Sequence, residues 1–543
     1  MKVYKIFIFF FILKTGYSKF HLNISPEERK SIFGTFDINV PDYELVRIGH
    51  SIKTRETKDE KNILKFNAFG KSLRLELNKK KTVFSMNTPI WFAKGNSSSN
   101  VEYTRLDNDT LHDALKFYED PNNMAEVIVI RSDKRGSIEF IMHIRDRSSQ
   151  LTVFKAPSSV VQKWKEFFKK SKNSRVSRSA ETQFVQDYHI AINLENVEQS
   201  YKPIPNPVKR SQAKKKIESP PYTGPDPIYI RILLFINYGV EYVSESDLHL
   251  YKFLIYLVSF WNAVNLKFND FVNPSVRLHI SGVVIGNNKL AAPYLQDSFE
   301  PNGKYVDSNL ALLKFRDFLR QKNQQKIMNL TWDIAITQTD LKLCYWKNVT
   351  HTASNVGLAH VGQTCNNENS DDSPVAIIHD SNNFRGIFTA AHEIAHVLGA
   401  VHDGSGNNSC PQNGSFIMQS NNGYVYGPNS DTWSSCSIDE ILTVFKNKCW
   451  SGNSLGNENV NIPDILPGHM VSLLDQCQSR KFTNACDESK TTCEKLYCWN
   501  DSDLPNFLDK CINAGAPLSG TYCGVKKHCI NQKCVPIIDD NIL

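Results

Sequence analysis

Residues 389–403 read T-A-A-H-E-I-A-H-V-L-G-A-V-H-D. His392 and His396 are four residues apart in a run with few helix breakers, so on a helix both imidazoles lie on one face and can share a metal ion. Glu393 follows the first histidine and projects beside that metal, where a carboxylate can act on a bound water molecule without being a ligand. The spacing therefore predicts a helix, from about Phe384 to Ala400, that carries a metal site.

Two further residues extend this pattern beyond the helix. A residue without Cβ tolerates positive φ, so Gly399 can turn the chain back and bring His402 to a third ligand position. Three neutral imidazoles and one water molecule make the open tetrahedral zinc site that is typical of catalysis. A helix with two buried, hydrogen-bonded histidines is the alternative, and the longer pattern H-E-x-x-H-x-x-G-x-x-H-D weighs against it.

This longer pattern resembles the signature of the metzincin zinc endopeptidases. Asp403 directly follows the third histidine, and this makes the pattern similar to that of the reprolysin branch. The branch contains snake-venom metalloproteinases and the ADAM and ADAMTS proteases. The resemblance implies one catalytic zinc and Glu393 as the general base. Met418, about sixteen residues beyond the last histidine, matches the family's Met-turn, an apolar floor below the metal. The implied zinc ligands are His392, His396 and His402.

Composition and charge indicate a folded, multidomain protein without a nucleic-acid function. The chain has 543 residues, enough for two to four domains, of which 41% are hydrophobic and 22% charged. The net charge of +7 is modest for this length and is spread along the chain. The family resemblance implies extracellular protein substrates, and we expect a monomer.

The amino terminus is typical of a signal peptide. Lys2 and Lys5 precede the short apolar run Ile6–Leu13, and Ser18 offers a small residue for cleavage. The run is too short to span a bilayer, and no later stretch is apolar for long enough. The sequence therefore predicts a secreted, extracellular protein with no membrane span.

The 13 cysteines divide the chain. None precedes Cys344, five lie between Cys344 and Cys449, and eight lie between Cys477 and Cys534. The dense block predicts a disulfide framework, because it lacks the paired C-x-x-C knuckles of a zinc ribbon. It resembles the disintegrin-like/cysteine-rich module of ADAMTS proteases. The family resemblance further implies the pairs Cys365–Cys449 and Cys410–Cys436, which leaves Cys344 as the odd cysteine.

The cysteine-free segment before the catalytic pattern resembles a propeptide. Alternating runs such as Ser137–Ile144 predict strands. Arg175 and Arg178 form an R-x-x-R pattern that resembles a furin-type proprotein convertase site, and a second cut could fall in the basic, proline-rich stretch Pro203–Pro227. Without a cysteine this propeptide cannot place a thiolate on the zinc, so latency must come from steric cover of the cleft or from another ligand.

The predicted fold class is multidomain, with a β-rich propeptide, an α/β metzincin catalytic domain with a mixed sheet, and a small disulfide-rich C-terminal module. Strand-like segments alternate with helix-like ones after Asp226, and Gly357–Gly362 matches the family's substrate-binding edge strand. The predicted order is a signal peptide (1–18), a propeptide (19–178), a basic linker (179–225), the catalytic domain (226–452), a second linker (453–464) and the module (465–537).

Two kinds of surface feature are predicted as well. In the family a structural calcium can lie near positions matching Asp333 and Asn453, but Arg231 occupies the place of a third, acidic ligand, so that calcium site is doubtful. In a secreted chain, sequons mark glycosylation candidates. They are Asn23, Asn96, Asn108, Asn329, Asn348, Asn407, Asn413 and Asn500.

The best-supported hypothesis is a secreted zinc endopeptidase made as a zymogen, similar to the compact reprolysins of arthropods, including those of tick saliva. One alternative is a non-catalytic binding protein, an antagonist that acts through the cysteine-rich module. Another is a structural zinc protein with a fourth side-chain ligand, for which His360 and His379 are available in the sequence. The intact ligand pattern, base and methionine favour the enzyme.

Overall fold

The computed structural model describes residues 20–537 with gaps. The longer segments outside the description are 1–19, 30–39, 51–61, 80–87, 107–114, 164–187, 196–223, 238–246, 322–328, 363–373, 421–428, 447–464, 501–510 and 538–543, and there are breaks of one to four residues elsewhere. The described chain forms two compact units. Unit 1 comprises residues 1–80, 112–199 and 539–543, and unit 2 comprises residues 81–111 and 200–538.

Unit 1 is built on one nine-stranded antiparallel sheet. Alternation along its strands places one row of apolar side chains on the core face, including the fully buried Leu64, Leu75, Val127 and Met142. In spatial order the strands are β1 (Asp42–Arg47), β11 (Tyr188–Glu195), β10 (Ser149–Lys155), β9 (Ser137–Asp146), β8 (Ala125–Ser132), β7 (Leu115–Asp120), β4 (Lys71–Lys79), β3 (Asn62–Ala68) and β2 (Gly49–His50).

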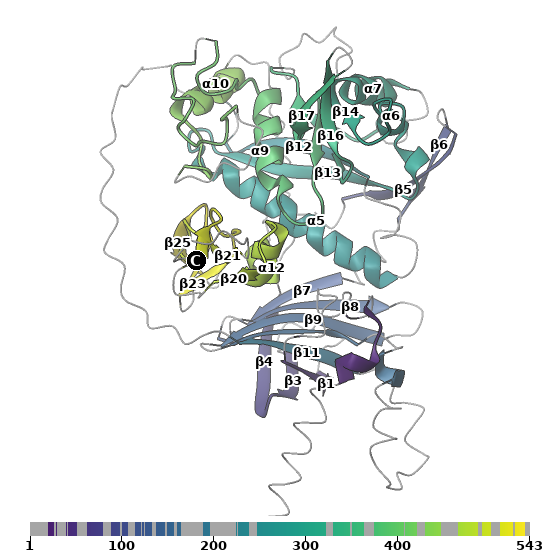
Figure 1. Ribbon diagram of the computed structural model, residues 1–543, viewed down its shortest axis with the longest axis vertical. Helices are drawn as coiled ribbons and strands as arrows, with labels where there is room; N and C mark the ends of the chain where they lie inside the picture. The colour runs from purple at the N-terminus through teal and green to yellow at the C-terminus, as the bar shows by residue number, and fades with distance from the viewer. Residues whose placement is uncertain are drawn as a thin grey trace, which may run out of the picture. The chain divides into compact units, whose positions relative to one another are not determined.

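Unit 2 contains a seven-stranded mixed sheet, as the sequence predicts for the catalytic domain (Figure 1). Its central strands are parallel, and both end strands are antiparallel to their neighbours. In spatial order they are β18 (Gly357–Ala359), β19 (Val375–His379), β15 (Ile334–Thr339), β12 (Ile228–Asn237), β13 (Val276–Gly286), β5 (Ile90–Ser97) and β6 (Asn100–Arg105). A small second sheet joins β14 (Val306–Asp307), β16 (Leu343–Lys347) and β17 (Thr350–Asn355).

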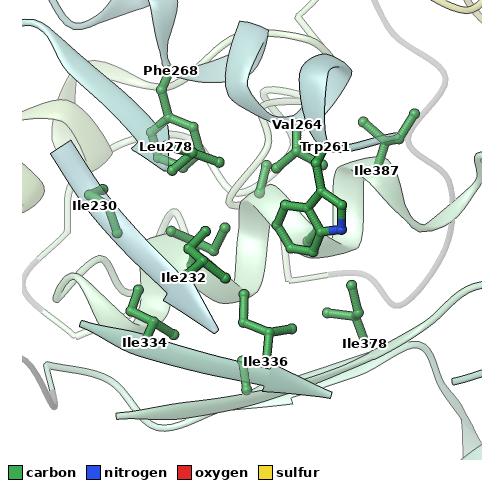
Figure 2. Packing of buried hydrophobic residues seen from close by; sticks show 14 of the residues in the cluster. Ile230, Ile232, Trp261, Val264, Phe268, Leu278, Ile334, Ile336, Ile378 and Ile387 are labelled. Atoms are coloured by element: carbon green, nitrogen blue, oxygen red, sulfur yellow. The ribbon is translucent and has the colours of Figure 1, made fainter. Parts of the chain in front are cut away.

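Helices cover both faces of the large sheet, which explains why β12 is apolar along its whole length. Ile230 and Ile232 face the long helix α5 (Asp247–Lys267) and α9 (Gly386–Val397). Trp261 of α5 is fully buried in the same core (Figure 2). The alternate residues, such as Phe235, pack in a second core with α6 (Pro293–Gln296) and α7 (Ser308–Arg320). A last helix of this region, α10, spans Ser435–Lys446.

The units divide the chain differently from the expected domain boundaries at two places. Strands β5 and β6 lie within the expected propeptide, yet they complete the sheet of unit 2. Strand β11 lies within the expected linker 179–225, yet it is an internal strand of the sheet of unit 1. The sequence Y-H-I-A-I-N-L-E of β11 alternates as a strand does, so part of the expected linker is a structural element.

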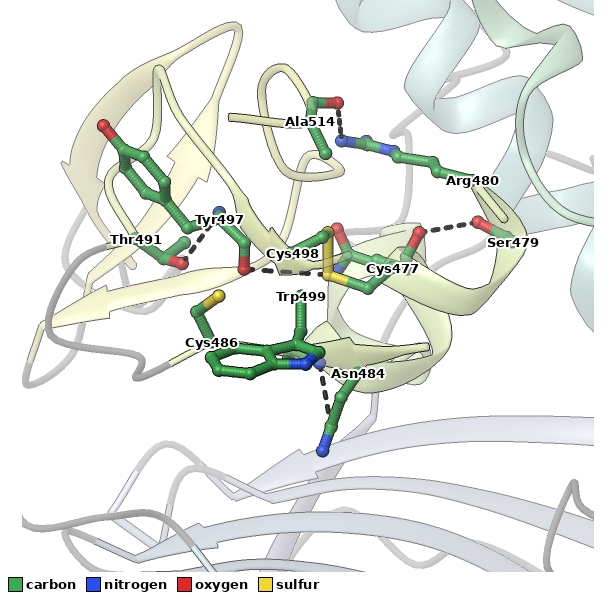
Figure 3. Close-up of a disulfide and its surroundings, with 12 residues drawn as sticks. Cys477, Ser479, Arg480, Asn484, Cys486, Thr491, Tyr497, Cys498, Trp499 and Ala514 are labelled. Carbon is green, nitrogen blue, oxygen red and sulfur yellow. Dashed lines mark hydrogen bonds between the residues drawn. A yellow bond between two sulfur atoms is a disulfide. The ribbon is translucent and has the colours of Figure 1, made fainter. Parts of the chain in front are cut away.

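Residues 465–537 form the predicted disulfide-rich module. Two three-stranded sheets, β20 (Asn484–Ala485)–β21 (Tyr497–Trp499)–β22 (Cys511–Asn513) and β23 (Tyr522–Gly524)–β24 (Lys527–Ile530)–β25 (Lys533–Pro536), follow the helices α11 (Pro467–Met470) and α12 (Leu473–Ser479). Figure 3 shows the bridge that joins α12 to β21. The four disulfides are Cys477–Cys498, Cys486–Cys511, Cys493–Cys529 and Cys523–Cys534.

The module packs against the carboxyl end of α5. Asn531 donates from Nδ2 to the carbonyl of Leu266 at 2.8 Å. The ammonium of the neighbouring Lys267 is buried and pairs with the carboxylate of Asp431, which lies just before α10. This ion pair joins α5 to the segment before α10 beside the module. Among the described residues no helix is long and apolar enough to cross a membrane.

We expect the Lys267–Asp431 pair to be sensitive to the loss of one partner. Asp431→Asn should lower the free energy of unfolding by about 1–3 kcal/mol. The substitution removes the paired carboxylate of a buried amine whose pKa burial already lowers to about 7, and Asp270 remains as a nearby carboxylate. The double variant Lys267→Met/Asp431→Leu should recover most of the loss. Urea unfolding followed by tryptophan fluorescence measures both, and equal destabilisation by the single and double variants would contradict this account.

Candidate active site

Helix α9 begins where a buried carboxylate fixes its first turn. The carboxylate of Asp380, 1% exposed, accepts hydrogen bonds from the Gly386 amide at 3.2 Å and from the Tyr256 hydroxyl of α5 at 2.5 Å. A Cβ at position 386 would lie 2.7 Å from the Cβ of Asp380, so only glycine allows this approach. The bonds tie the start of α9 to α5, and the observed helix lies within the predicted span.

Three imidazoles converge at the other end of α9. The Nε2 atom of His402 lies 3.1 Å from that of His392 and 3.2 Å from that of His396. Gly399, at φ 101°, turns the chain after the helix and so brings His402 back. The three side chains together could hold a metal ion, because their ligand atoms all lie within 4.8 Å of one another.

Backbone carbonyls fix the orientation of the two helical histidines. The Nδ1–H of His392 donates to the carbonyl of Ile417 at 2.7 Å, and that of His396 donates to the carbonyl of Ala400 at 2.8 Å. Each Nε2 therefore keeps its lone pair for the shared centre. Burial lowers the pKa of His392 to about 3 and that of His396 to about 4, which keeps both rings neutral, as metal ligands must be. The donor set therefore fits a zinc ion.

Glu393 lies against the terminal strand of the sheet. Its side chain is 5% exposed, and a Cβ at Gly357 of β18 would lie 2.6 Å from its Oε1 atom. Burial raises the pKa of this carboxyl well above its usual value, although a hydrogen bond from the Ala359 backbone opposes the shift. The amide of Gly362 also donates to the carbonyl of His396 at 2.9 Å. The Gly357–Gly362 segment thus runs directly beside the histidine helix.

Met418 is fully buried and belongs to a turn that holds two parts of the site together. Its carbonyl accepts from the Asp403 amide at 2.9 Å, directly after the third histidine. The preceding carbonyl, of Ile417, accepts from His392. The role of Ile417 was not visible in the sequence, because the interaction uses a backbone atom.

Helix α10 supplies a second support that the sequence analysis did not identify. The Oε2 atom of Glu440 accepts from the Val401 amide at 3.0 Å, and the Ser434 hydroxyl donates to the Asp403 carboxylate at 2.5 Å. These bonds hold the residues immediately before and after His402, Val401 and Asp403. A disulfide, Cys410–Cys436, further ties the loop after His402 to this helix. Ser434 was detectable as a residue before a helix, whereas Glu440 has a backbone partner that no side-chain pattern reveals.

The remaining predicted residues are distributed as follows. His360 is exposed, and His379 bonds through Nδ1 to the Leu341 carbonyl at 2.9 Å; within the described chain, neither joins the three converging histidines. Cys344 is buried and free. Of the sequons, Asn23, Asn96, Asn329 and Asn413 are exposed and Asn500 is half-buried. Outside the described residues lie Arg175, Arg178, Cys365, Cys449, Asn108, Asn348, Asn407 and Asn453.

At the doubtful calcium position the structure has an ion pair. Arg231 donates from Nη2 to Oδ1 of Asp333 at 2.6 Å and from Nε to Oδ2 at 3.0 Å, and its backbone amide also donates to Oδ2 at 2.7 Å. The hydrogen bonds to Asp333 raise the pKa of the Arg231 guanidinium. Both carboxylate oxygens are therefore engaged by a fixed cation of the chain itself.

Comparison with known proteins gives two matching families. Residues 231–434 match a reprolysin model of metallopeptidase family M12, and residues 467–535 match the ADAMTS cysteine-rich domain 2. A silkworm (Bombyx mori) protein, "A disintegrin and metalloproteinase with thrombospondin motifs like", is 26% identical over 90% of this chain and 74% of its own length. Rat "A disintegrin and metalloproteinase with thrombospondin motifs 7" is 32% identical over 38% of this chain.

The match to the rat protein covers only 12% of its length, so the chain spans a small part of that relative. "Venom metalloproteinase 2" of Eulophus pennicornis is 24% identical over 33% of this chain and 41% of its own length. Among solved structures, metalloproteinase-II of Bacteroides fragilis has a TM-score of 0.31 at 13% identity, and the alignment covers 71% of this chain and 92% of that protein.

We expect Glu440 to slow the loss of metal by holding the His402 loop. Glu440→Ala should speed zinc release to a chelator by about tenfold, in the range of supporting-residue effects. Asp439→Ala is the matched control, since that side chain is exposed on the same helix. Stopped-flow release to a zinc-binding dye measures both rates. Equal rates in the two variants would exclude a supporting role for Glu440.

The Arg231–Asp333 pair predicts that calcium does not bind at this position. Millimolar calcium should leave the melting temperature of the unaltered protein unchanged, because binding raises stability only where a site exists. Arg231→Glu exchanges the cation for a carboxylate and should make the melting temperature rise with calcium but not with magnesium. A calcium-dependent rise in the unaltered protein would show that calcium binds at this or another place.

Proposed function

We propose that this chain, a zinc metalloendopeptidase of the reprolysin type with an ADAMTS-like cysteine-rich region, is secreted as a zymogen and hydrolyses peptide bonds of extracellular matrix or plasma proteins. One observation carries the proposal: three imidazole Nε2 atoms converge beside a buried carboxylate at the terminal strand of a sheet. This arrangement combines a metal-binding donor set, a proton acceptor and a backbone edge for a peptide.

In this proposal His392, His396 and His402 hold the zinc, and each remaining residue has one role. A bound zinc would polarise the scissile carbonyl and acidify a water molecule. Glu393 accepts the proton of that water and delivers it to the leaving amine. Burial raises the pKa of this carboxyl, and a shift in this direction makes a carboxylate a stronger proton acceptor.

The substrate backbone would lie along β18. This strand ends the sheet next to Glu393, so an extended peptide can add to it as a further strand. Gly357 brings the strand close to the carboxylate, and any larger residue there would meet Thr389 or Glu393. The scissile bond would then be presented within reach of the base.

The cysteine-rich module is proposed as an exosite, a surface that binds substrate away from the chemistry. Its position relative to the histidine site is fixed by bonds to α5 and to the segment before α10. Besides the Asn531 contact, Asn262 of α5 donates to the Ile465 carbonyl at 3.0 Å, and Gln532 donates to the Ser430 hydroxyl at 2.7 Å. A substrate bound to the module would therefore meet the active site in one orientation.

Processing is proposed to follow the secretory route. A signal peptidase would remove residues 1–18, and a proprotein convertase would cut after Arg178. Glycans on the exposed sequons are compatible with that route. With no cysteine before Cys344, latency in this proposal does not use a thiolate.

The central test is Glu393→Gln. We expect this variant to bind zinc in a one-to-one ratio, as the unaltered protein does, and to lose cleavage of gelatin or fibrinogen by about 10²–10⁴-fold, since general base catalysis contributes that much. His392→Ala is the companion variant and should lose both zinc and activity. Zinc content by mass spectrometry and cleavage by gel measure the two effects. Normal cleavage by Glu393→Gln would refute the mechanism.

The same assay separates the alternatives. Chelator-sensitive cleavage by the mature form supports the enzyme. Zinc present with no cleavage of any protein would favour a structural zinc protein, and absence of both zinc and cleavage would favour a binding protein that acts through the module.

A further inference from the structure

The hairpin β5–β6, residues 88–106, is an integral part of the sheet in unit 2. Strand β5 pairs with β13 in parallel, from Ile90 opposite Val283 to Ala93 opposite Gly286. The amide of Val283 donates to the Pro89 carbonyl at 3.0 Å, and that of Asn287 donates to the Ala93 carbonyl at 2.8 Å. This edge of the sheet lies opposite the edge formed by β18.

Side-chain packing secures the hairpin more firmly than a surface contact would. Ile90 is 2% exposed and belongs to the core under α5, whereas Trp91 and Val101 are buried in the core on the other face of the sheet. The side chain of Asn288 bonds to both the amide and the carbonyl of Gly95, at 3.0 and 2.8 Å. A Cβ at Gly95 would lie 2.1 Å from the Leu290 carbonyl oxygen, so the backbones touch directly.

Strand β11 has the reverse arrangement: it follows Arg178 in the sequence, yet it belongs to the sheet of unit 1. It lies between β1 and β10 in the sheet of unit 1, with Ile190, Ala191 and Ile192 buried. Arg47 of β1 donates to the Tyr188 hydroxyl at 2.8 Å and stacks on its ring. In the sequence, Arg175 and Arg178 stand between these two exchanged elements: β5 and β6 come before them, and β11 comes after them.

We propose that a cut after Arg178 leaves the two fragments interlocked by reciprocal strand exchange. The amino-terminal fragment keeps β5 and β6 in the catalytic sheet, and the carboxy-terminal fragment keeps β11 in the amino-terminal sheet. The proposal rests on the processing site of the proposed function. Hydrolysis of that one peptide bond removes neither set of strand contacts, so it does not by itself release the amino-terminal fragment.

The test uses the full-length chain carrying Glu393→Gln to prevent self-cleavage. Residues 175–178 are replaced by a tobacco etch virus protease site, so that cutting does not depend on a convertase. After complete cutting, we expect both fragments to elute together from a native size-exclusion column at the volume of the uncut chain, and to separate only in denaturant. Separation on the native column would overturn the proposal.

A parallel experiment separates a failure of this proposal from a failure of the proposed processing site. The chain with its own Arg175–Arg178 sequence is incubated with furin. Failure to cut there would refute the proposed processing site, while the engineered cut still decides whether the strands interlock the fragments.

Two variants of the cut protein test the hairpin. At one fixed urea concentration that separates the unaltered fragments slowly, Gly95→Val should speed their separation at least tenfold, because any side chain there meets the Leu290 backbone. Lys94→Ala, an exposed neighbour on β5, should leave the rate unchanged. Equal rates for both variants would overturn the role of the hairpin.

If Gly95→Val does not fold, hydrogen exchange on the cut parent protein supplies the same decision. The amides of Val283 and Asn287 should stay as protected as in the uncut chain, because their acceptors lie on the hairpin. Loss of that protection after cutting would show that β5 has left the sheet.

Discussion

The geometry of the site depends on one buried carboxylate, that of Asp380. A buried charge is tolerated only when it is hydrogen-bonded, and here the bonds come from α5, from Gln338 of β15 and from the first turn of α9. The helix that carries two histidines is therefore fixed at its start to a second helix and to the central sheet. Its far end is fixed by Gly399 and by the carbonyls that accept from the imidazoles. Between these ends the side chains have little freedom to leave the common centre.

The sequence predicted the parts of this site that depend on side-chain spacing. Two histidines one helical turn apart, a glycine that reverses the chain and a third histidine require a helix followed by a tight return, and α9 with Gly399 has that form. The sequence could not reveal Ile417 or Glu440, whose contributions pass through a backbone carbonyl and a backbone amide. Such partners are set by tertiary packing, and the identity of the residue carries little trace of them.

The sequence did not predict that β5 and β6 join the sheet of unit 2, or that β11 joins the sheet of unit 1, for a related reason. Alternation shows that a segment is a strand, but not which sheet edge it joins. Trp91 and Val101 would suit the core of either unit, and only their burial beside Leu233 and Phe235 decides between them. Strand β11 alternates as well, but it lies between the basic R-x-x-R pattern that ends at Arg178 and the basic, proline-rich stretch Pro203–Pro227, which together indicate a linker. The composition of the longer segment therefore favoured a linker, although the eight residues of β11 alternate as a strand does.

In the proposed zymogen, a cysteine-free amino-terminal segment would have to control the zinc site by means other than a sulfur ligand. Thiolate ligation can be reversed by one bond exchange, because the inhibitor acts through one atom. Reciprocal strand exchange acts through many backbone hydrogen bonds and several buried side chains, among them Ile90, Trp91 and Ala191, which must separate together. Separation of the fragments is then limited by extraction of strands from two sheets, and the hydrolysis that precedes it does not set the rate. Processing and release become two events with separate timing, and conditions that loosen sheet edges govern the second.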